Sequence, residues 1–216
     1  MIHRLLLTVA ATTTALLMAC AGPEPPPEPG LEILQHGRNE EMQVAPGIDW
    51  SKYGRIILHT APVEFRENWK RDQERNFGIT LHDEDIERFK ATVSDQLGKV
   101  MEKRISEAGD YKLTDESGPD VLRFQPNIVD LDIRGPGWVQ NSILETMTNS
   151  RGSMTLEVVI RDSVTDELLA VAWQNQSDPQ EGYMEMTNVV NNTVAFRLMM
   201  QRWTDWLFRQ LDKAGS

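Results

Sequence analysis

The sequence predicts an α+β domain: a two-layer sandwich with two long helices on one face of a mostly antiparallel sheet of about four strands. Two observations predict it. Segments near 80–109 and 187–211 carry apolar residues at three- and four-residue spacing, which is typical of amphipathic helices. Four shorter segments are continuously apolar or alternate apolar with polar residues, as strands do. Their order is strand, helix, three strands, helix, which favours α+β architecture.

The first predicted strand, 55–63, is a nearly continuous apolar run that ends at Pro62. Such a run indicates a strand covered on both faces. We interpret His59 as a histidine of the core or sheet face rather than a metal ligand or base, because no second His or Cys stands at metal-ligand spacing. The preceding stretch, 31–53, is mixed and turn-rich. The stretch 64–78 is highly charged, and we expect a solvated excursion that Trp69 and Phe77 attach to the domain.

The first helix is predicted to begin with Thr80 as its N-cap and to end near Gly109. Acidic residues at 83, 84 and 85 complement the positive end of the helix dipole. A metal site formed by these acids with His82 is the alternative, but the dipole explains the acids without a metal. The apolar stripe consists of Ile86, Phe89, Val93, Leu97, Val100, Met101 and Ile105.

The second strand, 121–133, alternates apolar and polar residues, but the parity changes along it. The change follows Pro126, and proline is tolerated in sheets mainly at edges or bulges, so we expect a bulge there. Asp130 and Asp132 would share one face at strand spacing. They are either an acid–base carboxylate pair or part of a solvated face. Nothing nearby would hold one of them protonated, which favours the solvated face.

Strands at 154–161 and 168–174 are predicted to form a hairpin around a turn at 162–167. A four-residue loop would place Ile160 opposite Leu169, Val158 opposite Val171, and Leu156 opposite Trp173. This register puts every large residue, Trp173 included, in the core.

The last helix is predicted to begin at Thr187 or Asn188 and to pack its apolar side against the sheet. A lipid or cofactor groove is the alternative, because the stripe is rich in Trp and Met. The stripe consists of Val190, Val194, Leu198, Met199, Trp203, Trp206, Leu207 and Leu211.

The long connection 135–151 is the candidate ligand or partner surface, because loops of this length are uncommon without a role or a helix of their own. Its candidate residues are Gly135, Trp138, Ile143 and Met147. Its Gly-Pro-Gly start lacks the spacing of a phosphate-binding loop.

Residues 1–19 have the features of an export signal, with a short basic start and an apolar run too short to span a membrane. The segment Leu17-Met18-Ala19-Cys20 resembles the lipobox of bacterial lipoproteins. This resemblance implies cleavage between Ala19 and Cys20, with S-diacylglycerol and N-acyl groups, such as palmitate, on Cys20. The only cysteine of the chain cannot pair within it.

Residues 20–30 are predicted to form a tether, because five prolines in residues 21–30 favour extended polyproline II. A proline-rich ligand for aromatic grooves is the alternative interpretation. Residues 31–216 would then form a single periplasmic domain. By the lipoprotein sorting rule, Ala21 after the cysteine predicts the inner leaflet of the Gram-negative outer membrane. The periplasmic face of the inner membrane is the alternative.

The net charge argues against nucleic acid as a partner. Cleavage would remove one basic residue (Arg4) and no acidic ones, so the mature charge is 21 − 33 = −12. A strongly acidic chain lacks the basic stripe that neutralises phosphates.

Several blocks look like an uncharacterised bacterial lipoprotein family, the domain-of-unknown-function 3313 family. They are the Cys20 lipobox, the stretches 46–53, 118–124 and 161–170, and the tryptophan-bearing final helix. Asp166 departs from the family pattern, which often has Gly in this turn. The resemblance implies a cell-envelope lipoprotein and supplies no catalytic residues.

Motifs of common hydrolases are missing from the sequence. It contains no Gly-x-Ser-x-Gly elbow, no His-Glu-x-x-His pair and no Cys–His pair in a recognisable context. We therefore expect a membrane-anchored, noncatalytic binding or scaffolding module of the cell envelope, without cofactor or metal, with an envelope protein as a possible partner. A small-ligand or lipid carrier and a periplasmic hydrolase are the alternatives. The sequence does not indicate the oligomeric state.

Overall fold

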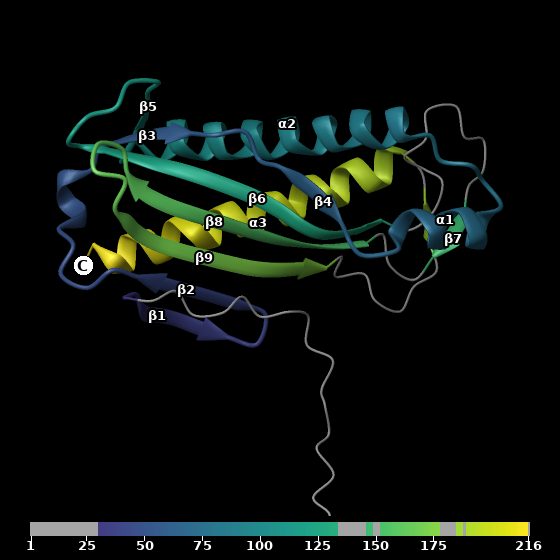
Figure 1. Cartoon of the computed structure of the whole chain (residues 1–216), viewed down its shortest axis with the longest axis horizontal. Coiled ribbons are helices and arrows are strands. Elements are labelled where there is room, and N and C mark those ends of the chain that lie inside the picture. The colour runs from purple at the N-terminus through teal and green to yellow at the C-terminus, as the bar shows by residue number, and fades with distance from the viewer. Residues whose placement is uncertain (1–29, 134–145, 149–151, 178–184, 188, 216) are drawn as a thin grey trace, which may run out of the picture.

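The computed structural model describes residues 30–133, 146–148, 152–177, 185–187 and 189–215. Within these residues, one mixed sheet of eight strands is backed by two long helices, α2 (Asp83–Ala108) and α3 (Val189–Ala214). Figure 1 shows α2 and α3 lying across the same face of the sheet. Among the described helices, none is long and apolar enough to cross a membrane.

The sheet has the strand order β1-β2-β9-β8-β6-β3-β5, and β4 pairs with β6 beyond the end of β3. The pairs β3–β5, β3–β6 and β4–β6 are parallel, and the others are antiparallel. Its strands are β1 (Glu32–Gly37), β2 (Glu40–Val44), β3 (Arg55–Leu58), β4 (Val63–Phe65), β5 (Lys112–Leu113), β6 (Val121–Ile133), β8 (Gly152–Asp162) and β9 (Leu168–Ser177). A separate pair joins β7 (Thr146–Thr148) to β10 (Glu185–Thr187), and a short 3-10 helix, η1, spans Trp50–Lys52.

The predicted sheet of about four strands is wrong, because the sheet has eight. The β1–β2 hairpin lies in the stretch expected to be turn-rich, and it joins the sheet through β2, which pairs with β9. β1 is an edge strand with an exposed, polar pattern, so its sequence carries little apolar alternation. β4 and β5 are only three and two residues long and have no periodicity to detect.

The predicted helical stripes form much of the core. Leu97, Met101 and Ile105 of α2 are fully buried, and α2 ends before Gly109, which has a positive φ of 77°. The N-cap is His82 rather than Thr80, with the acidic residues in the first turn as expected. Of the α3 stripe, Met199, Trp203, Trp206, Leu207 and Leu211 are buried, whereas Leu198 is 47% exposed.

The bulge in β6 lies further along than predicted. The register with β8 shifts between Val129 and Asp132, where Asp130 has a φ of 51°. The bulge returns the second half of the strand to the original face, so the large apolar residues on both sides of it face the core. These are Leu122, Phe124, Ile128, Leu131 and Ile133, all fully buried.

Pro126 is paired in register with Val158, and its position explains why it is tolerated. Phe124 O accepts a hydrogen bond from His59 N, and Ile128 N donates to Pro62 O. By the two-residue period, the nitrogen of Pro126 faces the same side, between the end of β3 and the start of β4. A missing N–H therefore costs no ladder hydrogen bond there.

The predicted register of the β8–β9 hairpin is wrong by one residue. Val158 pairs with Ala172, and Glu157 pairs with Trp173, because the register shifts next to the turn. Trp173 is buried, but this pairing places it on the sheet face opposite the helices. We call this face, which carries Glu41, Gln43, Glu157 and Trp173, the outer face.

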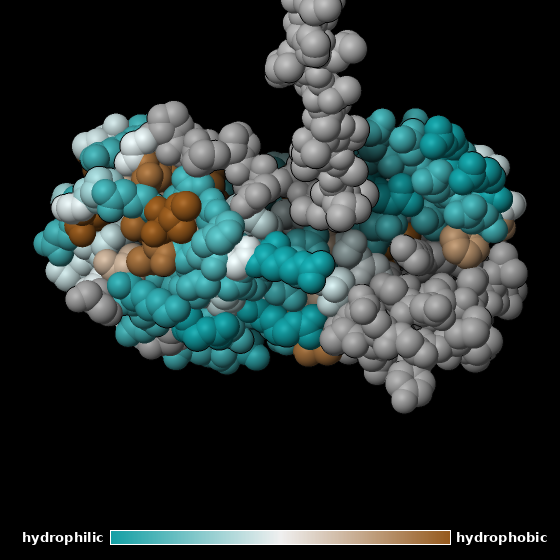
Figure 2. All heavy atoms as spheres, turned by 90° about the horizontal axis from the view of Figure 1, so that it is seen from below, coloured by the Kyte–Doolittle hydropathy of each residue, from teal (hydrophilic) through white to brown (hydrophobic). Residues whose placement is uncertain are grey.

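The charged stretch after β4 contains a short helix, α1 (Trp69–Phe77), and Trp69 attaches it to the domain as expected. The Trp69 ring stacks on Phe65 with ring centroids 3.8 Å apart, and its Nε1 donates to Ile133 O over 3.0 Å. Seen from the β1–β2 edge, the described surface is mostly hydrophilic, with a compact hydrophobic patch toward the end where α3 terminates (Figure 2).

Candidate functional site

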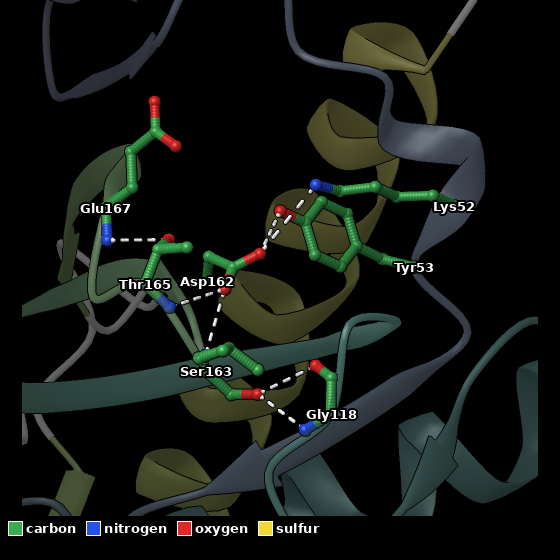
Figure 3. Close-up of polar contacts among 8 residues, drawn as sticks. Lys52, Tyr53, Gly118, Asp162, Ser163, Thr165 and Glu167 are labelled. Atoms are coloured by element: carbon green, nitrogen blue, oxygen red, sulfur yellow. Dashed lines mark hydrogen bonds and ion pairs between the residues drawn. The ribbon is translucent and has the colours of Figure 1, made fainter.

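The turn between β8 and β9 holds a cluster of polar groups that joins three distant parts of the chain (Figure 3). We call it the Asp162 cluster. Asp162, 5% exposed, accepts hydrogen bonds at Oδ1 from the backbone N–H groups of Val164 and Thr165, both over 2.9 Å. At Oδ2 it accepts from the Tyr53 hydroxyl over 2.9 Å, and Lys52 Nζ lies 3.7 Å away. The carboxylate thus holds its own turn in shape and binds it to η1.

The electrostatics of this carboxylate follow from its contacts. Burial alone would raise the pKa of Asp162. The backbone N–H groups of Thr165 and Val164 and the Tyr53 hydroxyl outweigh that effect and lower the pKa to about 2. Asp162 is therefore ionised at every physiological pH. For Tyr53, burial and the neighbouring carboxylate raise the pKa above its ordinary value, so its hydroxyl remains a donor.

Ser163 provides the second half of the cluster. Its Oγ accepts a hydrogen bond from Gly118 N over 3.1 Å and donates one to Gly118 O over 3.0 Å. Its backbone N–H donates to Val121 O. The hairpin turn is thereby attached to the segment that leads into β6, and the Ser163 hydroxyl is engaged as donor and acceptor with one backbone residue.

These contacts hold the β8–β9 turn to Tyr53 and Gly118, and they do not form a nucleophilic site. A serine nucleophile needs a base positioned to take its proton. The proton of Ser163 is donated to a backbone carbonyl, and the neighbouring carboxylate accepts from the backbone and Tyr53 instead. None of the histidines at 36, 59 and 82 is a partner of Ser163 in the described hydrogen bonds.

The outer face holds a second group of polar residues, arranged as a cross-strand row. In order across the sheet, the row consists of His36, Glu41, Trp173, Glu157 and Asn127. Glu41 is 5% exposed; its carboxylate contacts His36 Nδ1 at 2.7 Å and accepts from Gln43 Nε2 over 2.6 Å. Partial burial raises the pKa of Glu157.

Trp173 stands at the centre of this row. Trp173 is only 8% exposed, although α2 and α3 lie on the other face. Its indole Nε1 is buried and has no hydrogen-bond partner among the described residues, as is also the case for Trp203 and Trp206 of α3. A buried, unpaired N–H carries a desolvation cost, so it requires an explanation.

Most residues proposed as sites from the sequence lie outside the described residues. Cys20, Gly135, Trp138 and Ile143 belong to this group. Met147 lies in β7, opposite Met186 of β10.

The titratable candidates are placed apart from one another. His59 is exposed beyond the end of β3, so the prediction of a core or sheet-face histidine is wrong. Asp83 pairs with Lys70, whose ammonium lowers the pKa of that carboxyl. Asp132 forms an ion pair with Arg66 over 3.1 Å, whereas Asp130 occupies the bulge. Within the described ranges, no group of three or more His, Cys, Asp or Glu residues could hold a metal ion.

Sequence reasoning missed both clusters. The roles of Tyr53 and Asp162 depend on a contact between residues 109 positions apart. The Asp-x-x-Thr spacing at 162–165 was a usable signal, because Asp and Thr side chains commonly cap turns. The outer-face row becomes visible only when the strand order is known.

Comparison with solved structures finds distant likenesses. The PelC dodecamer from Paraburkholderia phytofirmans has a TM-score of 0.39 and 4% identity, covering 76% of this chain and 93% of that one. Protein XCC0632 of Xanthomonas campestris, from family DUF330, has a TM-score of 0.42 and 9% identity, covering 76% and 86%. A putative neuraminyllactose-binding hemagglutinin homolog from Helicobacter pylori has a TM-score of 0.34 and 12% identity, covering 75% and 87%. Likenesses this distant carry no functional argument.

Comparison with curated proteins finds no match. A family model does match, over residues 33–207, and its description is "Protein of unknown function (DUF3313)". The match spans β1 to the middle of α3 and therefore most of the chain. The family expected from the sequence blocks is confirmed, and the chain belongs to the DUF3313 family.

Proposed function

We propose that the protein is a lipid-anchored module of the bacterial cell envelope that binds a partner in the periplasm and carries out no chemistry itself. The observation that carries the proposal is the segment Leu17-Met18-Ala19-Cys20 at the end of an apolar run, followed directly by a proline-rich stretch. The order signal, cysteine, spacer and folded domain suits a lipoprotein. Two or three acyl chains on Cys20 would anchor it stably, whereas one chain would not.

The folded domain is suited to this arrangement. β1 begins at Glu32, two residues after the proline-rich stretch, so the domain starts where the spacer ends. Ten residues of polyproline II extend about 31 Å, at roughly 3.1 Å per residue. A spacer of that length would hold the domain clear of the lipid headgroups.

The state of the polar clusters supports binding over catalysis. The Asp162 carboxylate and the Ser163 hydroxyl are both engaged in bonds that hold the fold together. Glu41 is likewise bonded to side chains of its own hairpin. These groups stabilise the fold, which leaves surface recognition as the activity that the described residues suit. Carriage of a small ligand or lipid, and hydrolysis, are the alternatives.

The anchor is tested by metabolic labelling with an alkyne fatty acid in a Gram-negative host, followed by separation of inner and outer membranes. We expect label on the wild type, in the outer-membrane fraction, and none on Cys20→Ala. Thr13→Ala, in the apolar run, is the matched control and should remain labelled. An unlabelled wild type would refute the anchor, and recovery with the inner membrane would refute the outer-membrane assignment.

The binding role is tested by a photocrosslinking amino acid placed at His36, whose side chain is 58% exposed at the end of the outer-face row. Mass spectrometry should identify one envelope protein crosslinked in the anchored form and lost with Cys20→Ala. The control site is Lys103, exposed on α2. Equal capture from both sites would contradict a specific surface. Labelling of the purified protein by a serine-hydrolase probe would favour the enzyme instead.

A further inference from the structure

Two arginines lie directly opposite each other on the outer face, near the β8–β9 turn. Arg123 of β6 pairs with Arg161 of β8, and Asn127 and Glu157 form a pair on the same face four residues away. Like charges opposite each other on antiparallel strands destabilise a sheet. The side chains of Arg123 and Arg161 are 25% and 32% exposed, so solvent screens their repulsion only in part. The pair therefore calls for a negatively charged group beside it.

Asp166 is the carboxylate that the two arginines share. Its Oδ1 accepts a hydrogen bond from Arg123 Nη2, and its backbone carbonyl accepts one from Arg161 Nη1 over 2.9 Å. Arg161 Nε lies 4.0 Å from Asp166 Oδ1, which is beyond hydrogen-bond distance. In the ion pairs of the described residues, two guanidinium groups therefore face one carboxylate. One positive charge is left unbalanced.

Arg55 shows how an arginine of this sheet holds a carboxylate when the contact is complete. Its Nε and Nη2 donate to the two oxygens of Asp120 over 2.9 and 2.6 Å. Such bidentate pairs are the strong form of the interaction. On Arg123, Asp166 occupies only the Nη2 position, and the neighbouring Nε is buried without a hydrogen-bond partner in the described part of the chain. The bidentate edge of Arg123 is thus half filled.

Asp166 can give way to a carboxylate from outside. Its side chain is 68% exposed, and exposed ion pairs contribute little to stability. A second carboxylate that formed two bonds to Arg123 would therefore replace a single weak one. Glu157 does not compete, because it lies four residues along β8 from Arg161, about 13 Å at 3.3 Å per residue. Its charge instead repels an acidic partner from that part of the face and directs it toward the arginines.

We propose that Arg123 and Arg161 bind a carboxylate of the protein partner, an Asp or Glu side chain of an exposed acidic segment. The inference rests on the proposed function, in which the domain recognises a periplasmic partner, and it names the charge that this partner carries. The carboxylate replaces the Asp166 side chain at Arg123 Nη2, reaches Nε as well, and balances the guanidinium of Arg161. Because Asp166 stays nearby, one further negative charge makes the site neutral, which favours a carboxylate over a doubly charged phosphate.

The test is an NMR titration of the arginine Nε–H signals in the complete mature chain with Cys20→Ala, with a blocked tetraglutamate peptide as the probe. This protein needs neither lipid nor partner. A negative result would therefore refute the arginine site and leave the labelling and crosslinking tests of the proposed function unaffected. The two signals are identified by their loss in Arg123→Gln and Arg161→Gln. Arg55 is the internal reference, because its Nε is already bonded to Asp120.

We expect tetraglutamate to shift the Arg123 and Arg161 signals saturably and the Arg55 signal not at all, whereas blocked tetraglutamine shifts none. Asp166→Asn should tighten binding about threefold or more, because the competing carboxylate is lost. Arg161→Lys keeps the charge but loses the planar set of donors, so it should weaken binding by a similar factor.

Equal shifts at Arg55 would overturn the proposal, and so would binding that Asp166→Asn leaves unchanged or weakens. Shifts of the Arg123 and Arg161 signals with phosphatidylglycerol vesicles but not with tetraglutamate would overturn it in favour of a lipid headgroup.

Discussion

Replacement of Asp162 by Asn should destabilise the protein at neutral pH and do so less in acid. The variant keeps the shape of the side chain and an oxygen that can accept from Val164 N and Thr165 N. It loses the negative charge and presents an amide to the Tyr53 hydroxyl and the Lys52 ammonium. The Asp162 cluster would then hold η1 to the hairpin turn less firmly.

The magnitude follows from the pKa of the carboxyl group, which falls from 3.8 to about 2 on folding. At about 1.36 kcal/mol per pH unit, ionised Asp162 contributes on the order of 2 kcal/mol to the free energy of unfolding at pH 7. Because the folded-state pKa is the lower one, this stability is present above pH 4 and is lost as the pH falls toward 2. By the same linkage, about half remains at pH 3.

Urea unfolding followed by tryptophan fluorescence measures this directly at pH 7, 5 and 3. We expect Asp162→Asn to lose roughly 2 kcal/mol at pH 7 and about half as much at pH 3. Asp166→Asn, in the same turn with an exposed side chain, is the matched control and should change stability by less than about 0.5 kcal/mol. The reasoning would be refuted if Asp162→Asn unfolded at the same urea concentration as the wild type at pH 7. It would also be refuted if the loss in free energy of unfolding were as large at pH 3 as at pH 7.

Substitutions at three further positions, Asp166, Gly152 and Ser163, test the backbone and the contacts of the β8–β9 turn by thermal unfolding. Asp166 has a φ of 63°, a conformation that glycine adopts readily and a β-branched residue does not. Asp166→Gly should therefore leave the free energy of unfolding unchanged or slightly higher, whereas Asp166→Val should lower it by about 1–2 kcal/mol. Equal losses of stability in the two variants would contradict this. Gly152→Ala should lower the free energy of unfolding by about 1–3 kcal/mol, because a Cβ at this position would collide with Asp132 O. Gly98→Ala is the control: a Cβ there meets open space within α2, so this change should be stabilising. Ser163→Ala removes both side-chain hydrogen bonds to Gly118 and should lower the free energy of unfolding by about 1–2 kcal/mol. If the loss is no larger than that of Ser106→Ala, an exposed serine, the Ser163 contacts do not stabilise the turn.

The resemblance stated from the sequence implies glycine at position 166, and the structure explains why Asp166 can stand there. Its left-handed conformation is the one glycine adopts most readily, and Asp is among the few other residues that tolerate it. The turn therefore keeps its geometry with either residue. The sequence block alone showed the departure but not the backbone angle that makes it tolerable.

The long-period features were determined by the sequence alone. α2 and α3 are each 26 residues long, and an apolar stripe runs along most of each helix, so local periodicity is enough to predict helices and buried faces. The alternation of β6, β8 and β9 predicts strands for the same reason. The family also follows from short blocks that need no spatial information.

Tertiary structure decided the remaining features, because they depend on pairing between distant segments. β1, β2, β4 and β5 are too short or too polar to show a period, and they are stabilised by the strands beside them. One bulge beside the turn moved Trp173 from the helix face to the outer face, since a shift by one residue reverses every side chain of a strand. The Asp162 cluster joins η1 to a turn 109 residues away, a proximity that no local pattern encodes.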